Sequence, residues 1–485
     1  MFLLTSEQMQ ERDRHTITTL RVPGLVLMDH AGRAIAQAVR SQRPQRVTVV
    51  CGKGNNGGDG WACARWLHHW GFRVTVVSVI DPGQLRGEAA QAAEMAIASG
   101  VPYQVYSDGD SLPEADVFVD ALLGTGAARP LEGTMRRLAE QMNQQSPWTV
   151  AADVPTGVDA STGEVPSVAV RADVTVCLAA QKFGTAVTPG CLYAGRVEVA
   201  DIGIPLDPVA PYAAWVREED VRRAIAPRRP ETHKGSFGRV GILAGPMPGA
   251  AVLAGLGAAR AGAGLVVFGA EFPVSVAVPV EFVLRDTLQA EAWYRDCQAV
   301  VVGPGLGDRD ADRERARRVL EGHGGPGVID ADGLPLALEA GRALNTWVLT
   351  PHPKECARLL GWTTDRVQAS RLAAAQALAQ RTGAVVVLKG YRTIIADTRG
   401  RIRVNPTGHA ALATAGTGDV LAGIIGGLLA QGADPFTAAC AGVWLHGRAG
   451  EFAGEQVGSI STVASDVVEN ISRAISSCFD TPSGG

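Results

Sequence analysis

Three stretches in the first half of the chain place glycines and polar side chains directly after apolar runs. The first runs from Val47–Val50 into Gly52–Gly60, which contains Asn55, Asn56 and Asp59. Glycines let a backbone approach a ligand closely, and the N–H groups at a helix N-terminus attract phosphate. This stretch therefore predicts an anion-binding loop between a strand and a helix that begins at Trp61.

Two further stretches repeat this arrangement. Val119–Gly126 carries Asp120, and Ala152–Asp159 carries Asp153 and Thr156. A single loop aspartate most often caps a turn or a helix. Three such stretches at the strand ends of one sheet indicate instead the rim of a ligand-binding cleft.

The G-x-G-x-x-G spacing within Gly52–Gly57 also matches the dinucleotide-binding fingerprint. Asp81 follows Gly57 after about 24 residues, which makes a nicotinamide-dependent dehydrogenase one interpretation. Two features argue against a dehydrogenase. Asn55–Asp59 adds side chains that a pyrophosphate loop does not need. The motif also follows two predicted helices, one after Thr5 and one at Gly24–Val39, whereas the fingerprint is expected at the first strand of a chain. A Walker A loop is excluded because no Gly-Lys-Ser/Thr follows.

The second half ends in a comparable motif. Gly416–Asp419 precedes the apolar run VLAGIIGGLLAQG, which predicts a buried helix. The N–H groups at that helix start could stabilise a transferring phosphoryl group, and Asp419 could take a proton from a substrate hydroxyl. The alternative is an aspartate that only caps the helix. Gly303–Gly307, Thr350–Glu355 and Leu388–Thr393 also follow predicted strands.

Both halves alternate apolar strands with helices, which predicts α/β folds with mostly parallel sheets. The predicted strands are 47–50, 74–80, 117–119, 149–152, 174–178, 197–199, 239–243, 264–268, 299–302, 327–329, 347–349, 384–388 and 393–396. Prolines cluster between Ile204 and Pro230, so we expect two domains, at residues 1–210 and 220–480.

The composition narrows the class of protein. The 485 residues are 46% hydrophobic and 19% charged, with a net charge of −4, which is typical of a globular enzyme and argues against general nucleic-acid binding. The eight cysteines form no C-x-x-C pair, which fits a reducing cytosol. The N-terminus lacks a basic signal region and apolar runs are short, so we expect a soluble, cytoplasmic protein without membrane contact.

The motifs CGKGNNGGDG, VDALLGTGAARP and DVPTGVDA resemble, in order and spacing, the NAD(P)HX epimerase domain of the NAD(P)H-hydrate repair enzymes, over about residues 5–205. The resemblance implies that hydrated NAD(P)H binds to Asn55, Asn56, Gly57, Gly58, Asp59, Gly124, Thr125, Gly126, Ala127, Ala128, Arg129, Pro130 and Asp153. It implies a potassium ion on Asn56, Asp120 and Thr156, whose oxygens suit a hard cation. Asp153 would be the acid/base group that inverts C6.

The second half resembles the ribokinase-like superfamily and, within it, the ADP-dependent NAD(P)HX dehydratases, over about residues 225–475. The motifs are KGSFGRVGILAG, VGPGLG, DADG, TPHPKE, LKGYRT and NPTGHAALATAGTGD. The resemblance places ADP against Lys389, Gly390, Tyr391, Arg392, Thr393, His409, Thr414, Ala415, Gly416, Thr417 and Gly418. It places the hydrated cofactor against Gly305, Gly307, His352, Pro353, Lys354, Glu355 and Asp419.

Together the two resemblances imply one repair enzyme with two activities, an isomerase and a lyase, acting on NADHX and NADPHX. ADP would donate phosphate with Mg²⁺ on the nucleotide, and Asp419 would be the base. A homo-oligomer is expected, and the small residues of Ala250–Ala263 would allow tight packing. Two alternatives stay open: a ribokinase-like kinase of a small alcohol with a regulatory first domain, and a first domain that binds without catalysis.

Overall fold

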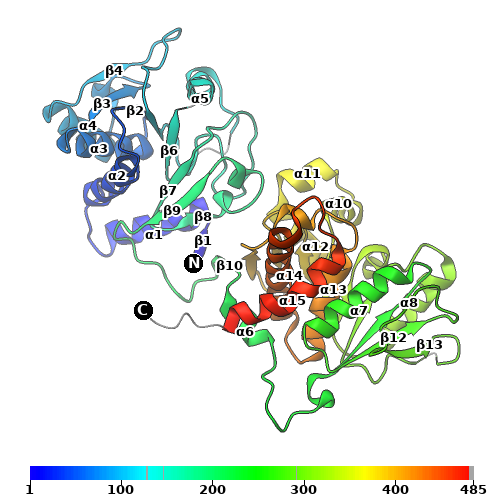
Figure 1. Cartoon of the computed structure of the whole chain (residues 1–485). Coiled ribbons are helices and arrows are strands. Elements are labelled where there is room, and N and C mark those ends of the chain that lie inside the picture. Colours follow the sequence, from blue (N-terminus) through cyan, green and yellow to red (C-terminus); the bar gives the residue numbers. More distant parts are fainter. Residues whose placement is uncertain (127–128, 146, 291, 480–485) are drawn as a thin grey trace. The chain divides into compact units, whose positions relative to one another are not determined.

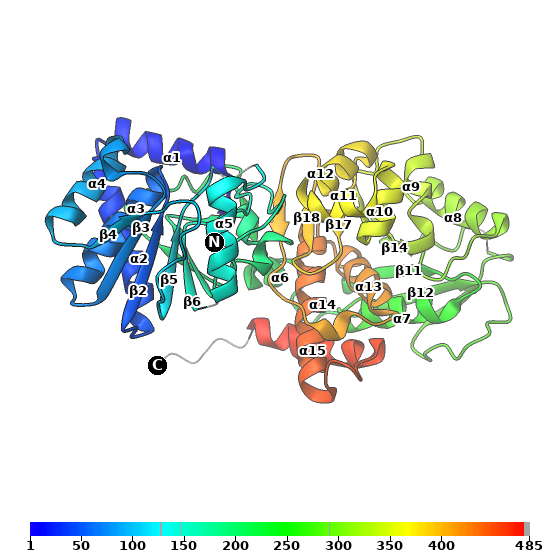
Figure 2. The same ribbon diagram turned by 90° about the horizontal axis from the view of Figure 1, so that it is seen from above.

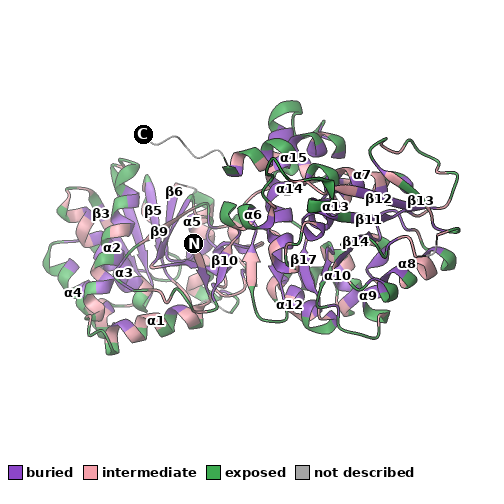
Figure 3. Cartoon of the chain, turned by 90° about the horizontal axis from the view of Figure 1, so that it is seen from below, coloured by how far each residue is buried: buried purple, intermediate pink, exposed green. Residues whose placement is uncertain are grey.

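The computed structural model describes residues 1–126, 129–145, 147–290 and 292–479. The chain divides into two compact units, Met1–Ala213 and Ala214–Gly485 (Figure 1). The division falls inside the proline-rich segment between Ile204 and Pro230. Each unit is an α/β fold around its own sheet, and the buried strands lie between helices whose outer faces are exposed (Figure 3).

The first unit contains a parallel sheet of seven strands. In spatial order these are β4 (Tyr103–Val105), β3 (Arg73–Ser78), β2 (Arg46–Cys51), β5 (Val117–Ala121), β6 (Trp148–Ala152), β7 (Val174–Leu178) and β9 (Arg196–Ala200). The chain runs outward from β2 to β4, returns to β5 and continues on the other side. The order therefore reverses between β2 and β5, where doubly wound sheets bind ligands.

Helices cover both faces of this sheet. The helices α2 (Gly24–Ser41), α3 (Asn55–His69) and α4 (Gly87–Ala98) pack on one face and α5 (Gly133–Gln145) on the other (Figure 1). Alternate strand residues serve the two faces: Val49 packs with the first group of helices, and Val50 packs with α5. The helix α1 (Ser6–Thr18) adds Met9 to the first group and begins with a capping box of Thr5 and Gln8.

The glycine stretch differs from its prediction. Helix α3 begins at Asn55, not at Trp61, so Asn55–Gly60 forms the first helical turns and is not a loop. The prediction failed because glycine is a poor helix former, and packing overrides that preference here. A Cβ on Gly57 would lie 1.9 Å from the carbonyl oxygen of Gly52, so only glycine lets the helix approach the end of β2 this closely.

The second unit contains a mixed sheet. In spatial order its strands are β13 (Val283–Asp286), β12 (Leu265–Ala270), β11 (Arg239–Leu243), β14 (Ala299–Val302), β15 (Gly327–Ile329), β16 (Trp347–Leu349), β17 (Val385–Leu388), β18 (Ile394–Ala396), β19 (Ile402–Val404) and β10 (Ala213–Trp215). The pairs from β13 to β17 are parallel, and β18 is antiparallel to β17 and β19. The carboxyl ends of β14, β15, β16 and β17 therefore lie side by side.

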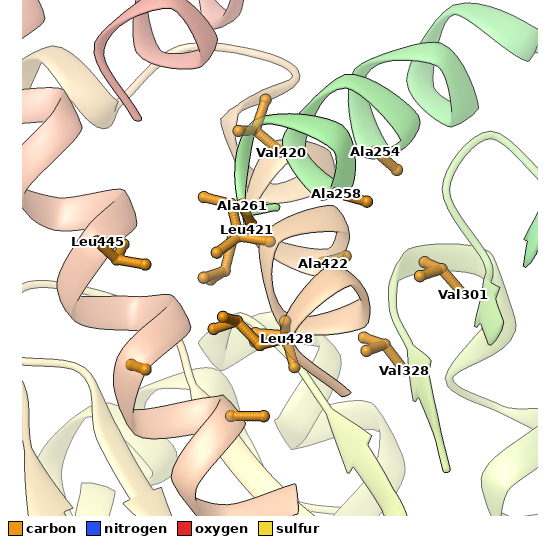
Figure 4. Packing of buried hydrophobic residues seen from close by; sticks show 14 of the residues in the cluster. Ala254, Ala258, Ala261, Val301, Val328, Val420, Leu421, Ala422, Leu428 and Leu445 are labelled. Carbon is orange, nitrogen blue, oxygen red and sulfur yellow. The ribbon is translucent and has the colours of Figure 1, made fainter. Parts of the chain in front are cut away.

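The helix α13 (Thr417–Ala430) is buried along nearly its whole length. It lies between α7 (Pro248–Arg260), α14 (Pro435–Val457) and strands β14 and β15, where Val420, Leu421 and Leu428 are buried (Figure 4). The remaining helices are α6 (Glu218–Ala224), α8 (Asp310–Gly322), α9 (Leu336–Glu339), α10 (Pro353–Leu360), α11 (Thr364–Ala369), α12 (Arg371–Thr382) and α15 (Ala464–Phe479). Figure 2 shows α8, α10 and α12 on the face of the sheet opposite α7 and α13.

The small residues of α7 serve this packing. Ala254 and Ala258 contact α13, where a Cβ on Gly423 would lie 1.8 Å from the carbonyl oxygen of Ala254. The alanine and glycine content of Ala250–Ala263 is thus explained within the chain, and it no longer supports a homo-oligomer, which stays a prediction. This packing of α13 against α7 supports the motif Gly416–Asp419 at the start of α13.

All thirteen predicted strands are found, with both ends within two residues of the prediction. Six strands were not predicted from the sequence, and each is short or lies at a sheet edge. They are β1 (Phe2–Leu4), which pairs with β8 (Gln181–Lys182), and β4, β10, β13 and β19. All eight cysteines are free thiols. None of the helices that the structure describes has the length and apolar character needed to span a bilayer.

Two candidate active sites

The first unit contains a cleft of about 500 Å³ at the strand ends where the sheet order reverses. Three of its walls come from the predicted stretches, since Asn55 and Asp59 follow β2, Gly124 follows β5 and Asp153 follows β6. A fourth wall is apolar and comes from segments that were not predicted to contribute. It consists of Met9, Ile17, Leu27, Met28, Ala31, Leu178, Ile202 and Ile204.

One end of this cleft suits an anion. The helix α3 begins there with its free backbone N–H groups, Gly54 as N-cap and Lys53 exposed at the rim. The loop Gly124–Gly126 closes the same end. Helix N-termini carry a partial positive charge, so the diphosphate of a nucleotide fits here.

The inner wall holds a buried ion pair between Asp153 and Lys182. Lys182 is 1% exposed and Asp153 is 8% exposed, and both line the cleft. The lysine ammonium also donates to the carbonyl oxygen of Leu178 at 2.7 Å. Asp153 adopts a φ of +67°, a backbone conformation that residues with a side chain rarely take and that is often found at functional sites.

Three more carboxyl groups line the cleft around this pair: Asp13, Asp59 and Glu88. Burial raises the pKa of Asp59 well above its usual range, and the charges of Asp153 and Asp13 raise it further, against Lys182. Burial and the charge of Glu88 likewise raise the pKa of Asp13. The cleft thus combines an inner part lined by carboxyl groups of raised pKa with an end that suits an anion.

Behind the cleft lies a second buried carboxylate, Asp120, at the end of β5. It accepts hydrogen bonds from the Thr156 hydroxyl (2.7 Å) and the backbone N–H groups of Thr156 (2.8 Å) and Leu122 (3.3 Å). Burial raises the pKa of Asp120 to about 6, although these neutral donors lower it. The side-chain amide nitrogen of Asn56 is buried without a hydrogen-bond partner.

The structure unites part of the predicted first site. Asn55, Asn56, Asp59, Gly124, Thr125, Gly126 and Asp153 line one cleft. Gly57 and Gly58 lie behind it and pack against Gly52 and Met28, whereas Arg129 and Pro130 are exposed and do not line it. Ala127 and Ala128 lie outside the described residues. Asp81 is elsewhere, where it caps a turn by accepting from Gly83.

Sequence reasoning missed Lys182, Asp13 and Glu88. Lys182 follows β7 in an otherwise apolar segment, and Asp13 and Glu88 lie on helices α1 and α4. None carries a local motif, because the fold alone brings them to the strand ends. A single lysine inside an apolar segment was the one available signal.

The second unit gathers charged residues at the carboxyl ends of β15, β16 and β17. The Lys389 ammonium donates to Asp330 Oδ1 at 2.8 Å and lies 4.0 Å from Glu355 Oε2. Glu355 and His352 hold each other at the start of α10 through a reciprocal capping box. Burial lowers the pKa of Lys389, but the charges of Asp330, Glu355 and Asp419 outweigh it and raise that pKa.

Asp419 lies in the first turn of α13, after Gly416, which adopts a φ of +88° at the N-cap. The helix start faces the lysine, since a Cβ on Gly418 would lie 3.3 Å from Lys389 Nζ. Burial raises the pKa of Asp419 to about 7, the charge of Asp330 raises it further, and Lys389 lowers it. A carboxylate with a pKa near 7 beside free helix N–H groups is suited to general-base catalysis.

The structure brings together Lys389, Glu355, His352, Gly418 and Asp419 of the predicted second site. Gly305 and Gly307 end the neighbouring strand β14, and Gly307 N–H donates to Asp332 at 2.9 Å. The other predicted ADP residues occupy the turn after β17 and the segment that leads into the first residue of α13, that is, Gly390, Tyr391, Arg392, Thr393, His409, Thr414, Ala415, Gly416 and Thr417. Pro353 and Lys354 open α10, where Lys354 is exposed.

The motif DADG contains Asp330 and Asp332, and the sequence alone assigns no role to either. In the structure Asp330 pairs with Lys389, and Asp332 accepts a hydrogen bond from the backbone N–H of Gly307. Asp330 is 1% exposed, so its charge is strongly coupled to its partner.

The two units are therefore a doubly wound α/β domain with a cleft at its strand ends and a ribokinase-like α/β domain with a carboxylate at a helix N-terminus. Comparisons with known proteins agree with this class. A family described as "YjeF-related protein N-terminus" matches residues 24–184, and one described as "NAD(P)H-hydrate dehydratase" matches residues 240–473.

Full-length relatives are similar over both units. A bifunctional NAD(P)H-hydrate repair enzyme of Moorella thermoacetica is 36% identical, with 97% of this chain and 96% of the relative covered. The enzyme of the same description from Escherichia coli is 33% identical, with 97% and 93% covered. The chain belongs to the family of bifunctional NAD(P)H-hydrate repair enzymes.

Among the solved structures similar to the second unit is the ADP/ATP-dependent NAD(P)H-hydrate dehydratase of Bacillus subtilis, co-crystallised with ATP and Mg²⁺. It is 34% identical, with a TM-score of 0.50, and the match covers 55% of this chain and 99% of that one. Family membership thus favours repair over the dehydrogenase, the small-alcohol kinase and the purely binding first domain.

Proposed function

We propose that this chain repairs hydrated NADH and NADPH with two separate sites. The first unit, about residues 1–210, interconverts the R and S epimers, and the second, about residues 220–480, dehydrates the S epimer with ADP. The observation that carries this proposal is the pair of carboxylates at two strand-end clusters: Asp153 inside the cleft and Asp419 at the start of α13. Free thiols support a cytoplasmic location.

In the first site, the diphosphate lies at the N-terminus of α3 and the loop Gly124–Gly126, and the hydrated ring lies in the apolar part near Asp153. Asp153 takes the proton of the C6 hydroxyl. The C6–N1 bond then breaks as C6 becomes an aldehyde, and its electron pair moves onto N1, where the conjugated carboxamide delocalises it. Rotation about C5–C6 presents the other face. N1 attacks that face, and the proton returns to the oxygen.

A potassium ion fits the residues behind this cleft. Asp120 is fully buried and receives neutral donors, among them the Thr156 hydroxyl, and a Cβ on Gly124 would lie 3.0 Å from the side-chain oxygen of Asn56. Carboxylate, hydroxyl and amide oxygens are the donors that hard cations prefer. We propose that Asn56, Asp120 and Thr156 hold the ion, which would neutralise the buried charge and fix the two loops.

In the second site, Asp419 takes the proton of the C6 hydroxyl while that oxygen attacks the β-phosphorus of ADP, and AMP leaves. The phosphorylated oxygen then departs from C6 as phosphate, a proton leaves C5, and the C5=C6 bond of NAD(P)H is restored. The N–H groups at Gly416–Gly418 stabilise the transferring phosphoryl group. Gly305, Gly307 and His352–Glu355 contact the hydrated ring, and Lys389–Thr393 with His409–Thr417 contacts the nucleotide.

Magnesium enters with the nucleotide in this proposal. The relative from Bacillus subtilis was crystallised with ATP and Mg²⁺. Within the described ranges, no cluster of three or more histidine, cysteine or acidic side chains is arranged to hold a metal ion by itself. When bound, the ion would neutralise phosphate charge during transfer.

The test follows recovery of the reduced-nicotinamide absorbance from a mixture of R and S NADHX, with ADP, with ATP and with neither. Full consumption of both epimers with ADP is expected. Recovery without nucleotide would overturn the dehydratase proposal, and a stable phosphorylated product would indicate a kinase instead. If only the S epimer is consumed above the spontaneous rate, the first unit is not an epimerase.

A further inference from the structure

Lys182 is one of the most buried charged side chains of the first unit, and no sequence motif predicted its position. It is 1% exposed at the end of β8, a two-residue strand that pairs with β1. A buried ammonium destabilises the fold unless its charge and all its N–H groups find partners. Its two partners are Asp153 Oδ1 and the carbonyl oxygen of Leu178.

These contacts fix the carboxylate of Asp153 from several sides. Its Oδ1 accepts from Lys182 and from the backbone N–H of Leu178 at 3.0 Å. Its own backbone N–H donates to the carbonyl oxygen of Val176 at 2.9 Å, and its φ is +67°. Since Oδ1 already has two donors, Oδ2 is the oxygen left for a substrate in the cleft that Asp153 lines.

The groups that face this pair from the surrounding elements are acidic or neutral. They are Asp13 on α1, Asp59 on α3, Glu88 on α4 and the buried thiol of Cys177 on β7. Lys53, at the rim, is exposed and follows β2. Lys182 is therefore the cation of the inner cleft that opposes the repulsion around Asp153.

We propose that Lys182 is a positioning residue for epimerisation, which opposes the negative charge around Asp153 and keeps its carboxylate turned so that Oδ2 meets the C6 hydroxyl. This inference rests on the proposed epimerase function of the first unit. An unpaired carboxylate in this place would take up a proton from water and would lose its ability to accept one from the substrate.

The experiment uses the full chain, the R epimer of NADHX and no ADP, with both epimers separated by chromatography between pH 5 and 9 and the spontaneous rate subtracted. Lys182→Met removes the charge and keeps most of the volume. We expect the acid limb of the pH–rate profile to move up by about 1 to 3 pH units. The rate should fall about 10- to 100-fold at pH 7 and recover partly at high pH.

Lys53→Met is the matched control, because it also removes one lysine from the cleft. It should raise KM through weaker phosphate binding and leave the acid limb in place. The double variant Asp153→Asn with Lys182→Met should be no slower than Asp153→Asn alone, because Lys182 acts through Asp153. Thermal unfolding and circular dichroism, measured on every variant, check that the first unit is folded.

The outcomes separate the two proposals. A wild-type chain that does not convert R to S contradicts the epimerase function itself. A wild-type chain that does, together with a Lys182→Met variant that keeps its acid limb, contradicts only the role of Lys182, as does a further loss in the double variant. If Lys182→Met does not fold, Lys182→Gln still donates to Asp153 without a charge, and its acid limb gives the same answer.

Discussion

The two proposed sites use an aspartate and a lysine in different arrangements. In the first site the lysine pairs directly with the proposed acid/base group, as Lys182 does with Asp153. In the second site Lys389 pairs with Asp330 and leaves Asp419 without that direct partner. The first arrangement places an ion pair inside an acidic cleft. The second lets burial raise the pKa of Asp419 to about 7, where it accepts a proton most effectively near neutral pH.

The supports of the two carboxylates differ in the same way. Asp153 follows β6 in a left-handed backbone conformation and depends on contacts from β7 and β8. Asp419 belongs to α13, which is packed on two helices and on the sheet (Figure 4). The first group is oriented by hydrogen bonds, and the second by its helix. We expect the first site to be the more sensitive to loss of a neighbouring side chain.

The largest expected effect is the loss of dehydration in Asp419→Asn. The amide cannot take the C6 hydroxyl proton, so ADP-dependent recovery of NADH from the S epimer should fall about 10²- to 10⁴-fold. The R-to-S conversion, followed by chromatography on the same preparation, should keep the wild-type rate. If both activities fell together, the two sites would not be independent.

Asp153→Asn should give the reverse result. Conversion of R to S should fall about 10²- to 10⁴-fold toward the spontaneous rate, and dehydration of pure S epimer should be unchanged. The progress curve on a mixture of epimers makes this visible, because recovery should then have one fast and one slow phase. A single fast phase in this variant would exclude Asp153 as the acid/base group.

Much of this arrangement follows from local sequence. Strand ends at Gly52, Asp120 and Asp153, and the helix start at Gly416, were predictable because apolar runs and glycines mark them. The positions of the side chains that surround the carboxylate of Asp153 were not predictable. Lys182 and Asp13 reach the cleft only through the pairing of β8 with β1 and the placement of α1, and long-range contacts leave no local pattern.

The start of α3 shows the opposite failure. Sequence propensity placed the helix at Trp61, because the glycines of Asn55–Gly60 disfavour helices. Close packing of α3 against the end of β2 requires glycine at Gly57, so tertiary packing overrides the low helix propensity of the glycines. Where propensity and fold disagree in this way, the disagreement falls at the site, as expected for a functional element.

Gly57→Ala tests how far the first site depends on this packing. The new Cβ would lie 1.9 Å from the carbonyl oxygen of Gly52, so the start of α3 must shift, and the unfolding free energy of the first unit should fall by about 1 to 3 kcal/mol. Epimerisation should fall at least about 10-fold, because the N–H groups at the anion-binding end move. Gly54→Ala, whose Cβ has open space, is the control and should leave thermal unfolding nearly unchanged.

The pH dependence of dehydration tests the second site. Asp419 must be ionised to accept a proton, and burial raises its pKa to about 7. Below pH 7, kcat/KM with ADP should therefore fall about tenfold for each pH unit. Lys389→Met should move this limb to higher pH, because the lysine charge lowers that pKa. A limb near pH 4 would show that the pKa of Asp419 is not raised in the working enzyme.

The smallest expected effect is on stability, and it has the opposite sign to the effect on activity. The pKa of Asp419 is raised to about 7 in the folded chain from 3.8, so folding favours the neutral form. Relative to Asp419→Asn, the wild-type chain should lose stability as pH rises from about 4 to about 7 and change little above that. At pH 8 the variant should be more stable by about 1 kcal/mol, because water that reaches this half-buried carboxyl screens much of the penalty.

Chemical unfolding of the ligand-free chain at pH 4 and pH 8 measures the difference. Equal midpoints at both pH values would mean that ionising Asp419 does not strain the fold, and the contrast with the directly paired Asp153 would then lose its physical basis.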